Sequence, residues 1–563
     1  MTRLLALLTL LLVIALGACG DSAVSPTDAT PPDAGVDHAV PKPDQKPTPV
    51  GPMANVYKVS PLADKKVTSQ VMLKGLSSKD GALTGSYANV WNCVAEEGGQ
   101  PINVSFGGMK VSGSLCVMKQ QAKPGADESY LHIKPAATDT DGKSSFPEVM
   151  MYHHLATIGS YYKESFGLSH VAKPLRAIVN LQGYGDLSPL GLPLKTWIGV
   201  PNAAYMPKEA ADELKKLIGV DILNGEEAIV FGYNNLMPTM PATNYSLDAL
   251  VIYHEYTHFT IGAGRLLQSA ADALGVDPSP KGLNEALADY LSCSFVDTPK
   301  MGEYALGSQS RDLTRTFKCP DHLIGEEHQD GEIMSGALWK ARAAVGAKDL
   351  DLAIWKAVLT FNLSTTFEQG ANAILAELKK IAPGKETVVE TIFKDQGVIG
   401  CNRLVEHKDY DNGANNPLSP TVDGKATAQA VFAKSGVPGP LQYSVAIKDT
   451  TKEIAIQYVP SSGGMFGVGG ARGNVWIALK KGGAPIQWDY ATGDAVSDAQ
   501  KTLKGADDGA TAYKLTLSGS CISKGTLVFQ LVNDDLSPNL ISSLKVTQSD
   551  TVSNPTPNFD GCP

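Results

Sequence analysis

The chain has 563 residues and a formal net charge of −10, and its apolar and charged fractions are those of a globular protein. This length exceeds what one ordinary hydrophobic core accommodates, so we expect two or three folded units. The acidic balance argues against the basic surface that nucleic-acid binding requires, and no nucleic-acid partner is expected.

The first residues have the pattern of a targeting segment. A short basic start, Met1–Arg3, precedes an apolar run, Leu4–Leu16, which is too short for a comfortable membrane span. The sequence Leu16-Gly17-Ala18-Cys19 resembles the bacterial lipobox, which implies a signal peptide over residues 1–18 and a lipid on Cys19. The alternative is an ordinary secretory signal with a chance cysteine. We therefore expect a protein of the cell envelope, anchored at the outer membrane or cell surface, or a secreted one.

Two segments without long helical patterns follow. Residues 19–52 are rich in Pro, Asp, Ala and Thr and show no apolar period, which predicts a disordered tether. Residues 53–145 contain short strand patterns between Gly and Ser turns, for example at 104–106 and 109–111. They predict a small β-rich segment ahead of the next unit.

Helical patterns dominate much of residues 146–411. Apolar residues three and four apart predict a helix over Phe146–Phe166, which Gly167 ends. Strands and turns are expected over 174–235, with one amphipathic helix over Lys208–Ile218. Further helices are predicted over Ala337–Val345, Leu350–Phe361, Phe367–Ile381 and Thr387–Lys394.

Alternating apolar residues return in the C-terminal part, residues 412–563. They occur at 443–447, 454–456, 475–477 and 527–531 and predict a small antiparallel β-sandwich. The segment Asp409–Gly413 faintly resembles a calcium loop, but no glutamate follows at the twelfth position, so calcium is not indicated.

Seven cysteines remain after Cys19, and export would permit disulfides among them. Cys93 with Cys116 would staple the β-rich segment, and Cys521 with Cys562 would pin the C-terminal tail. Three more compete for one bridge, which leaves one unpaired, and spacing does not choose among them. They are Cys293, Cys319 and Cys401.

The motif with the clearest chemistry is His254-Glu255-Tyr256-Thr257-His258. Histidines four residues apart lie on one face of a helix, so both imidazoles can reach one metal ion. Glu255 follows the first histidine and would lie beside a metal-bound water. Ser246 is expected to cap this helix, and Gly262 and Gly264 are expected to end it. A chance match to this short motif is the competing interpretation, so the third ligand decides.

A third ligand is expected from Gly282-Leu283-Asn284-Glu285-Ala286-Leu287-Ala288-Asp289. Glu285 and Asp289 are four residues apart and share one helical face. Each alone would usually be a solvated surface carboxylate, but their neighbours are apolar, and a buried carboxylate pair requires a cation. Glu285 can bind the metal while Asp289 orients a histidine from behind, which predicts one catalytic Zn²⁺.

The HExxH pattern followed by NExxxD resembles the gluzincin metallopeptidases, of the thermolysin and fungalysin types. The resemblance implies a thermolysin-like α+β domain with a β-rich N-terminal lobe and a helical C-terminal lobe, with His254, His258 and Glu285 as ligands. Further resemblances surround these motifs, at 201–205, 311–313 and 328–333. They cover residues 146–400 and imply an endopeptidase with protein or peptide substrates. We expect the protein to be a monomer.

The same resemblance implies roles for individual residues. Asn202 and Ala203 would hydrogen-bond the peptide main chain, and Arg311 would bind a substrate carbonyl. Glu255 would be the general base. His328 would stabilise the oxyanion, although one alignment register places Glu332 there instead. Residues 259–284 lack the tyrosine that thermolysin uses for this purpose.

Two other classes of function stay open from the sequence. A surface adhesin or binding lipoprotein could retain a structural zinc ion, but such a site does not need a base like Glu255 beside the metal. A zinc aminopeptidase would share the ligands and would need an acidic clamp for the free amino terminus. Glu226-Glu227 could imitate that clamp, although they follow Gly225 in an apparent turn.

Overall fold

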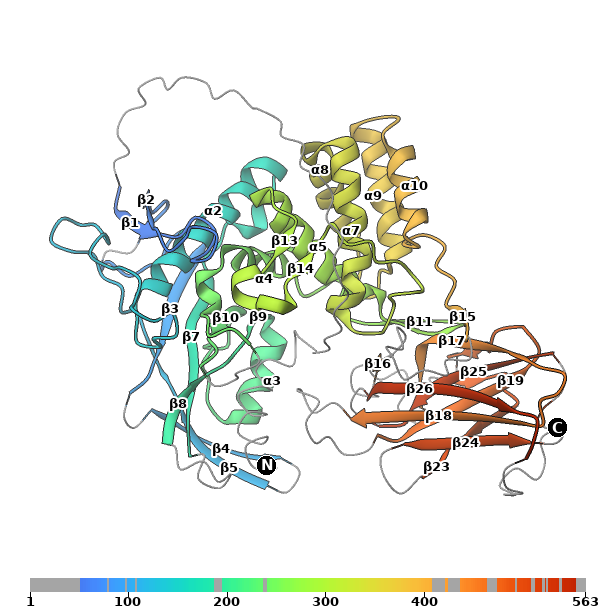
Figure 1. Ribbon diagram of the computed structural model, residues 1–563. Helices are drawn as coiled ribbons and strands as arrows, with labels where there is room; N and C mark the ends of the chain where they lie inside the picture. Colours follow the sequence, from blue (N-terminus) through green and yellow to red (C-terminus); the bar gives the residue numbers. More distant parts are fainter. Residues whose placement is uncertain are drawn as a thin grey trace.

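The computed structural model describes residues 51–77, 80–96, 99–106, 109–186, 195–235, 240–407, 421–423, 436–462, 473–491, 494–507, 512–518, 522, 525–535 and 539–552. The fold is mixed α+β, as the sequence predicts. In Figure 1 the sheet lies on the left, most helices lie at the upper right, and the C-terminal β-sandwich lies below these helices. The lipobox cysteine Cys19, the tether to residue 50, Asp409–Gly413, Cys521 and Cys562 lie outside the described residues.

One sheet unites strands from both sides of residue 145. Its main path is β4-β5-β7-β10-β9, with β3 and β8 paired to β7 and β6 paired to β3. Strand β3 runs parallel to β7, with Val90 opposite Ala177. The change of pattern at residue 145 is therefore a change from strand to helix within one sheet-forming unit. The strands are β3 (Ala88–Val94), β4 (Gln100–Phe106), β5 (Met109–Leu115), β6 (Val117–Lys119), β7 (Leu175–Asp186), β8 (Lys195–Gly199), β9 (Ala203–Met206) and β10 (Ala228–Gly232). A hairpin, β1 (Met53–Val56) and β2 (Ser69–Met72), precedes them.

Helix α2 (Phe146–Phe166) has the bounds that the sequence predicts. Pro147 lies in its first turn, where no backbone donor is needed, and Gly167 ends it in the left-handed region at φ 70°. Its apolar side chains share one core with β3, β7 and the helices over Ala249–Ile261 and Ser279–Val296. The short helix η1 (Ser169–Val171) follows, and α3 (Lys208–Ile218) also matches its predicted bounds.

The helical part follows β10. It contains η3 (Tyr245–Leu247), α4 (Ala249–Ile261), α5 (Ser279–Val296), α6 (Glu303–Leu306), η4 (Gly307–Gln309), α7 (Glu327–Val345), α8 (Ala347–Val358), α9 (Phe367–Ile381) and α10 (Glu386–Asp395). Between them lie a short hairpin, β11 (Ala270–Asp272) with β12 (Gly275–Asp277), and a two-residue antiparallel pair, β13 (Lys300–Met301) with β14 (Arg311–Asp312), whose connection contains α6 and η4. Helices α8 and α10 begin and end within three residues of the predicted bounds.

Two predictions about helix ends are wrong. Helix α7 begins ten residues before Ala337, because the Glu326 side chain accepts a hydrogen bond from the backbone N–H of Gln329 and caps an earlier start. Helix α4 is capped by Asp248, whose carboxylate accepts from the Leu250 N–H, while Ser246 lies in the preceding helix η3. Gly262 ends α4 as predicted.

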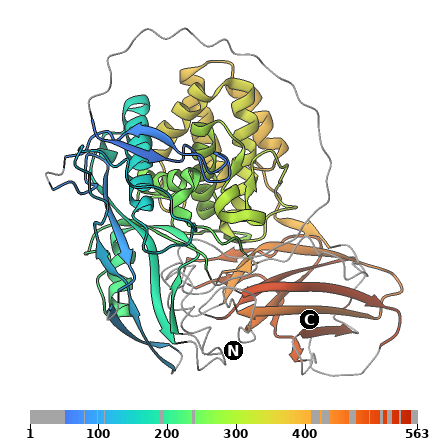
Figure 2. The same ribbon diagram turned by 60° about the vertical axis from the view of Figure 1, so that its left-hand side comes forward.

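The C-terminal part is a sandwich of two five-stranded sheets, seen as two layers in Figures 1 and 2. The orders are β15-β17-β25-β19-β22 and β16-β26-β18-β24-β23. The prediction of an antiparallel sandwich needs one correction, since β15 runs parallel to β17. The strands are β15 (Leu404–Glu406), β16 (Thr421–Val422), β17 (Val437–Ile447), β18 (Glu453–Ser462), β19 (Val475–Lys481), β22 (Lys501–Leu503), β23 (Ala506–Asp507), β24 (Tyr513–Ser518), β25 (Gly525–Asn533) and β26 (Asn539–Ser549). A separate hairpin joins β20 (Trp488–Asp489) to β21 (Val496–Ser497).

The described cysteines form two disulfides. Cys93 pairs with Cys116, as predicted, and joins the sheet strand β3 to the β5–β6 junction. Cys319 pairs with Cys401, which leaves Cys293 buried and unpaired in α5. This resolves the competition that spacing left open.

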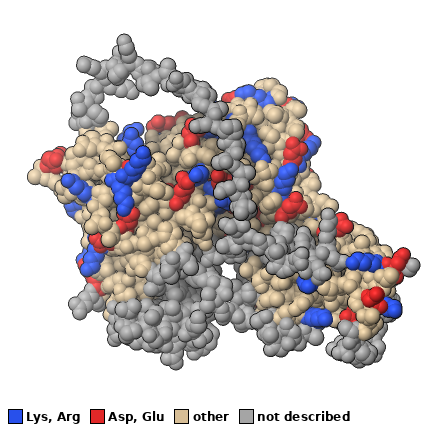
Figure 3. Space-filling model, in the orientation of Figure 1, with Lys and Arg blue, Asp and Glu red and all other residues tan. Residues whose placement is uncertain are grey.

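Acidic and basic side chains are interspersed on the face of the molecule in Figure 3. Among the residues that the structure describes, no helix combines the length and hydropathy that crossing a bilayer would require.

Candidate metal centre

Helix α4 presents His254, Glu255 and His258 to the interior. Asp248 fixes where the helix begins and Gly262 where it ends, and every side chain between them is buried. The helix is therefore buried on all sides. The two histidines lie one turn apart, and their Nε2 atoms approach to 3.0 Å.

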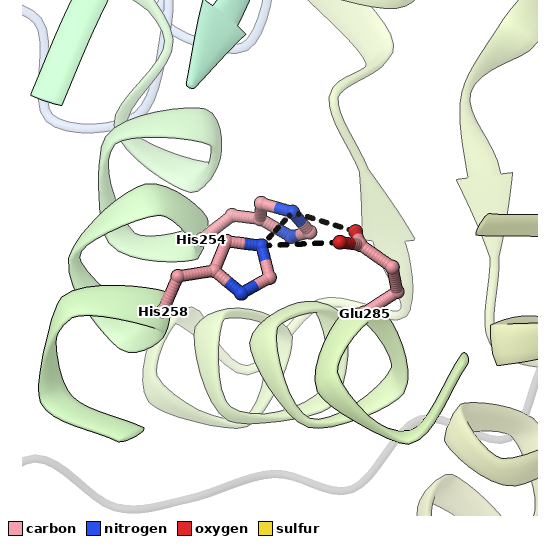
Figure 4. Close-up of side chains that lie close together, drawn as sticks. All are labelled: His254, His258 and Glu285. Carbon is pink, nitrogen blue, oxygen red and sulfur yellow. Dashed lines mark hydrogen bonds and ion pairs between the residues drawn. The ribbon is translucent and has the colours of Figure 1, made fainter. Parts of the chain in front are cut away.

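Glu285 of helix α5 completes a group that could hold a metal ion (Figure 4). Its Oε2 lies 3.2 Å from His254 Nε2, and its Oε1 lies 3.4 Å from His258 Nε2. The three side chains point toward one another from two helices and are all buried. The structure thus brings together the three residues that the spacing singled out.

The chemistry of this group fits a cation. Glu285 Oε2 is buried without an aligned hydrogen-bond donor, which is costly for a carboxylate oxygen unless a positive charge faces it. Burial would raise the pKa of Glu285, but the neighbouring His328, His258 and His254 outweigh burial and hold it well below its usual value. Two imidazole nitrogens and an ionised carboxylate form a set that borderline divalent metals prefer.

The outer ring nitrogens of both histidines have partners. His254 Nδ1 lies 2.9 Å from Asp289 Oδ1, although the oxygen is off the N–H direction. His258 Nδ1 lies 3.0 Å from the Asn284 side-chain oxygen. Such contacts fix the tautomer and the orientation of metal-binding imidazoles. Asp289 thus lies where the sequence predicts, whereas no role for Asn284 was predicted.

Arg311 holds Asp289 from the other side. Its Nε and Nη2 atoms each lie 2.6 Å from one oxygen of the carboxylate, in a two-pronged ion pair. Burial would raise the pKa of Asp289, but Arg311 and His254 outweigh burial and lower it to about 2. The carboxylate therefore stays ionised behind His254.

The two candidates for the oxyanion donor lie in different surroundings on α7. His328 Nε2 lies 3.3 Å from Glu285 Oε2, and its Nδ1 lies 2.8 Å from Glu326 Oε1. Glu332, one turn further on, points toward Arg315 with 3.6 Å between Oε2 and Nη1. Burial raises the pKa of Glu332 to about 7. The structure places His328, and not Glu332, beside the group that could hold a metal ion.

A pocket opens beside this group. Of the sequence-predicted site residues, Asn202, Ala203, His254, Glu255, Arg311 and His328 line it together. Four apolar or aromatic side chains that sequence reasoning missed complete the wall: Tyr245, Val251, Met301 and Leu306. Val251 precedes His254 by one helical turn, so helical spacing could have identified it.

Strand β9 forms one side of this pocket and is the last strand of its sheet. On its outer side, the Tyr205 N–H donates to Glu255 Oε2 at 2.7 Å. Residues two apart in a strand direct their backbone groups to the same side, so Ala203 faces outward as well. The main-chain groups of Ala203 therefore face away from the sheet, while the Tyr205 N–H orients Glu255.

Close contact between α5 and α7 brings His328 to Glu285, and glycines permit it. A Cβ on Gly331 would lie 3.0 Å from the Gly282 carbonyl oxygen and 3.2 Å from Glu285 Cβ. Any larger residue at 331 would push the two helices apart. Gly331 lies in the segment 328–333 noted in the sequence, but the sequence does not show how close the two helices come.

Glu226 and Glu227 do not line the pocket. Glu227 Oε2 accepts a hydrogen bond from the Tyr205 hydroxyl at 2.9 Å, and Glu227 also pairs with Lys173. The structure therefore supplies no acidic clamp from this pair.

Comparison of the sequence with protein-family models and with curated proteins finds no match. The resemblance to gluzincins consequently rests on the motifs, and the geometry above is independent of it.

Proposed function

We propose that this protein is a zinc-dependent endopeptidase with a thermolysin-like arrangement of a β-rich and a helical lobe. The observation that carries the proposal is the joint position of three features in one pocket. The three features are the two-histidine, one-carboxylate group, the glutamate beside it and the outer edge of β9. His254, Glu255 and Ala203 line the same pocket, and His258 and Glu285 lie 3.0 Å and 3.2 Å from His254 Nε2. A purely structural metal site would need only the first.

Zinc held by His254, His258 and Glu285 would keep a position for water and lower the pKa of that water toward neutrality. Glu255, oriented by the Tyr205 N–H, would accept the proton of the attacking water and deliver it to the leaving amine. His328, oriented by Glu326, would donate a hydrogen bond to the developing oxyanion. Arg311 lines the same pocket and would bind a substrate carbonyl.

Substrate would bind as a strand added to β9, through the main chain of Ala203 and the side chain of Asn202, whose own main-chain groups already bond to Val200 and Gly232. Main-chain bonds do not discriminate between side chains, so selection would come from the wall of the pocket. That wall is formed by Tyr245, Val251, Met301 and Leu306 and favours an apolar substrate side chain. The lipobox resemblance further leads us to propose that the enzyme is anchored to a membrane of the cell envelope through Cys19.

The test combines metal analysis with digestion of casein, followed by mass spectrometry of the products. We expect one zinc per chain and internal cleavage next to apolar residues. Glu255→Gln should keep the zinc and lose hydrolysis, because Gln cannot accept the proton. Glu226→Gln, an exposed change outside the pocket, serves as the matched control and should retain full activity. Release of single amino-terminal residues would indicate an aminopeptidase, and zinc without any hydrolysis would indicate a structural site.

A further inference from the structure

The connection between α4 and α5 contains a hairpin that reaches the C-terminal sandwich. Strands β11 and β12 pair through Ala271 and Val276, with Ala273 and Leu274 at the turn. This hairpin lies between His258 and Glu285 in the sequence, and it therefore joins the two helices that supply the metal-binding group.

The sandwich part of the chain donates hydrogen bonds to the carbonyl groups of this hairpin. The amide nitrogens of Gln442 and Gln530 lie 3.1 Å and 2.8 Å from the Leu274 oxygen, and both glutamines are fully buried. The Trp488 backbone N–H donates to Ala273 O at 2.9 Å. Arg403 Nη1 donates to Val276 O at 2.8 Å, and its other nitrogen pairs with Asp272.

The packing around the hairpin is equally close. Val276 belongs to a buried apolar cluster whose other members come from the sandwich side, among them Val437, Trp488 and Val528. Gly275 has φ 124°, and a Cβ there would lie 2.6 Å from Gln530 Nε2 and 2.8 Å from Gly439 O. The turn therefore packs closely against the sandwich, and a residue larger than glycine at position 275 would not fit.

The far end of the hairpin leads directly into α5. Asp277 Oδ1 accepts from the Ser279 N–H at 2.9 Å, at the start of the helix, and Glu285 follows within two turns. Asp423, which comes just after β16, accepts from Ser269 Oγ at 2.8 Å and lies 3.6 Å from Lys281 Nζ. The sandwich part of the chain thus contacts the connection on both sides of the hairpin.

We propose that the sandwich is part of the metal centre's support, and that Gln442, Gln530 and Arg403 are positioning residues for Glu285. They fix the hairpin, the hairpin fixes the start of α5, and α5 sets the distance from the Glu285 carboxylate to His254 and His258. This inference rests on the metal site of the proposed function. The C-terminal domain would then contribute to metal binding, whereas a domain that served only to bind substrate would have no such role.

Gln530→Met in the full-length protein tests the proposal, because Met keeps the volume and removes the bond to Leu274, together with the bonds to Gly439 and to the Trp488 indole N–H. Zinc dissociation, followed by transfer to a chromogenic chelator, should accelerate by about 3- to 10-fold, below the 10- to 100-fold typical of residues that touch a ligand directly. The visible spectrum of the Co²⁺-substituted protein should shift, since the position of the carboxylate changes. Gln548→Met, a glutamine of the same sandwich that bonds to Ala446 away from the hairpin, should leave both unchanged.

The experiment has to separate a general loss of protein stability from a displacement of Glu285. Leu515→Ala removes a buried side chain from β24 in the other sheet and should lower the melting temperature without changing zinc dissociation. If Gln530→Met fails to fold, Asp272→Asn provides a milder change, because this half-exposed carboxylate only loses its pair with Arg403. It should act in the same direction.

The proposal is overturned if Gln530→Met, or Asp272→Asn in its place, releases zinc at the native rate and keeps the native Co²⁺ spectrum. A native protein that binds zinc but hydrolyses nothing would refute the proposed function and leave this inference standing. A native protein that binds no zinc would refute both.

Discussion

The two residues His328 and Glu332 allow a sharp test of the oxyanion assignment. Both lie on α7, one turn apart, and sequence alignment alone did not choose between them. His328 lines the pocket and lies 3.3 Å from Glu285, whereas Glu332 points toward Arg315. An ionised glutamate cannot donate a hydrogen bond to an oxyanion, but a histidine can.

The expected magnitude follows from that geometry. Removing one oxyanion donor costs about 2.7–4 kcal/mol of transition-state stabilisation, so His328→Ala should lower kcat by roughly 100- to 1,000-fold. KM should change little, because the oxyanion forms only during the reaction. Zinc content should be retained, since His254, His258 and Glu285 remain. Glu332→Ala leaves the pocket wall intact and should lower kcat by less than about 10-fold.

Steady-state kinetics on a fluorogenic peptide, with zinc measured in the same samples, provides the assay. Glu326→Gln is a useful companion, because it keeps a hydrogen-bond acceptor for His328 Nδ1 but removes the charge, and it should give an intermediate loss. A fully active His328→Ala enzyme, or a Glu332→Ala enzyme that is the more impaired of the two, would contradict the assignment.

Three further predictions address the ligands, the packing and the anchor. Glu285→Ala should lower zinc occupancy to a small fraction, because two histidines alone bind weakly, and full occupancy measured by atomic absorption would place the third ligand elsewhere. Gly331→Ala should lower the free energy of unfolding, measured with a chemical denaturant, by about 1–3 kcal/mol and reduce kcat, because the added methyl group meets the backbone of α5. Gly264→Ala, which has open space around it, should leave the stability unchanged. Equal stability of the two variants would refute the close contact between α5 and α7. Cys19→Ser should abolish lipid attachment and membrane partitioning, and unchanged fractionation without any lipid detectable by mass spectrometry on the native protein would exclude the lipobox interpretation.

Features set by local spacing were readable from the sequence. The one-turn spacing of His254 and His258 and the apolar surroundings of Glu285 predicted which atoms meet, because a helix fixes those relations. The ends of α2 followed from Pro147 and Gly167 for the same local reason. Periodicity and turn residues therefore sufficed for these elements, whose determining contacts lie within a few residues.

Features set by distant contacts were not readable. The parallel pairing of β3 with β7 joins residues almost ninety positions apart, and nothing in either strand names its partner. The hydrogen bond that orients Glu255 comes from the backbone of Tyr205, and a backbone donor leaves no trace in residue type. One local contact was missed as well: the start of α7 was misplaced because its cap, Glu326, is not among the usual capping residues.

The pairing of β3 with β7 also limits how such an enzyme could be switched on. Many secreted peptidases are made as zymogens and activated when an N-terminal stretch is cut away. Removal of residues up to 145 would here take β3, β4, β5 and β6 out of the sheet and leave β7 without its neighbours β3 and β5. The same sheet carries β9, the strand we expect to bind substrate. Proteolytic removal of residues up to 145 would therefore disrupt the sheet that carries β9, and we expect it to abolish the proposed activity.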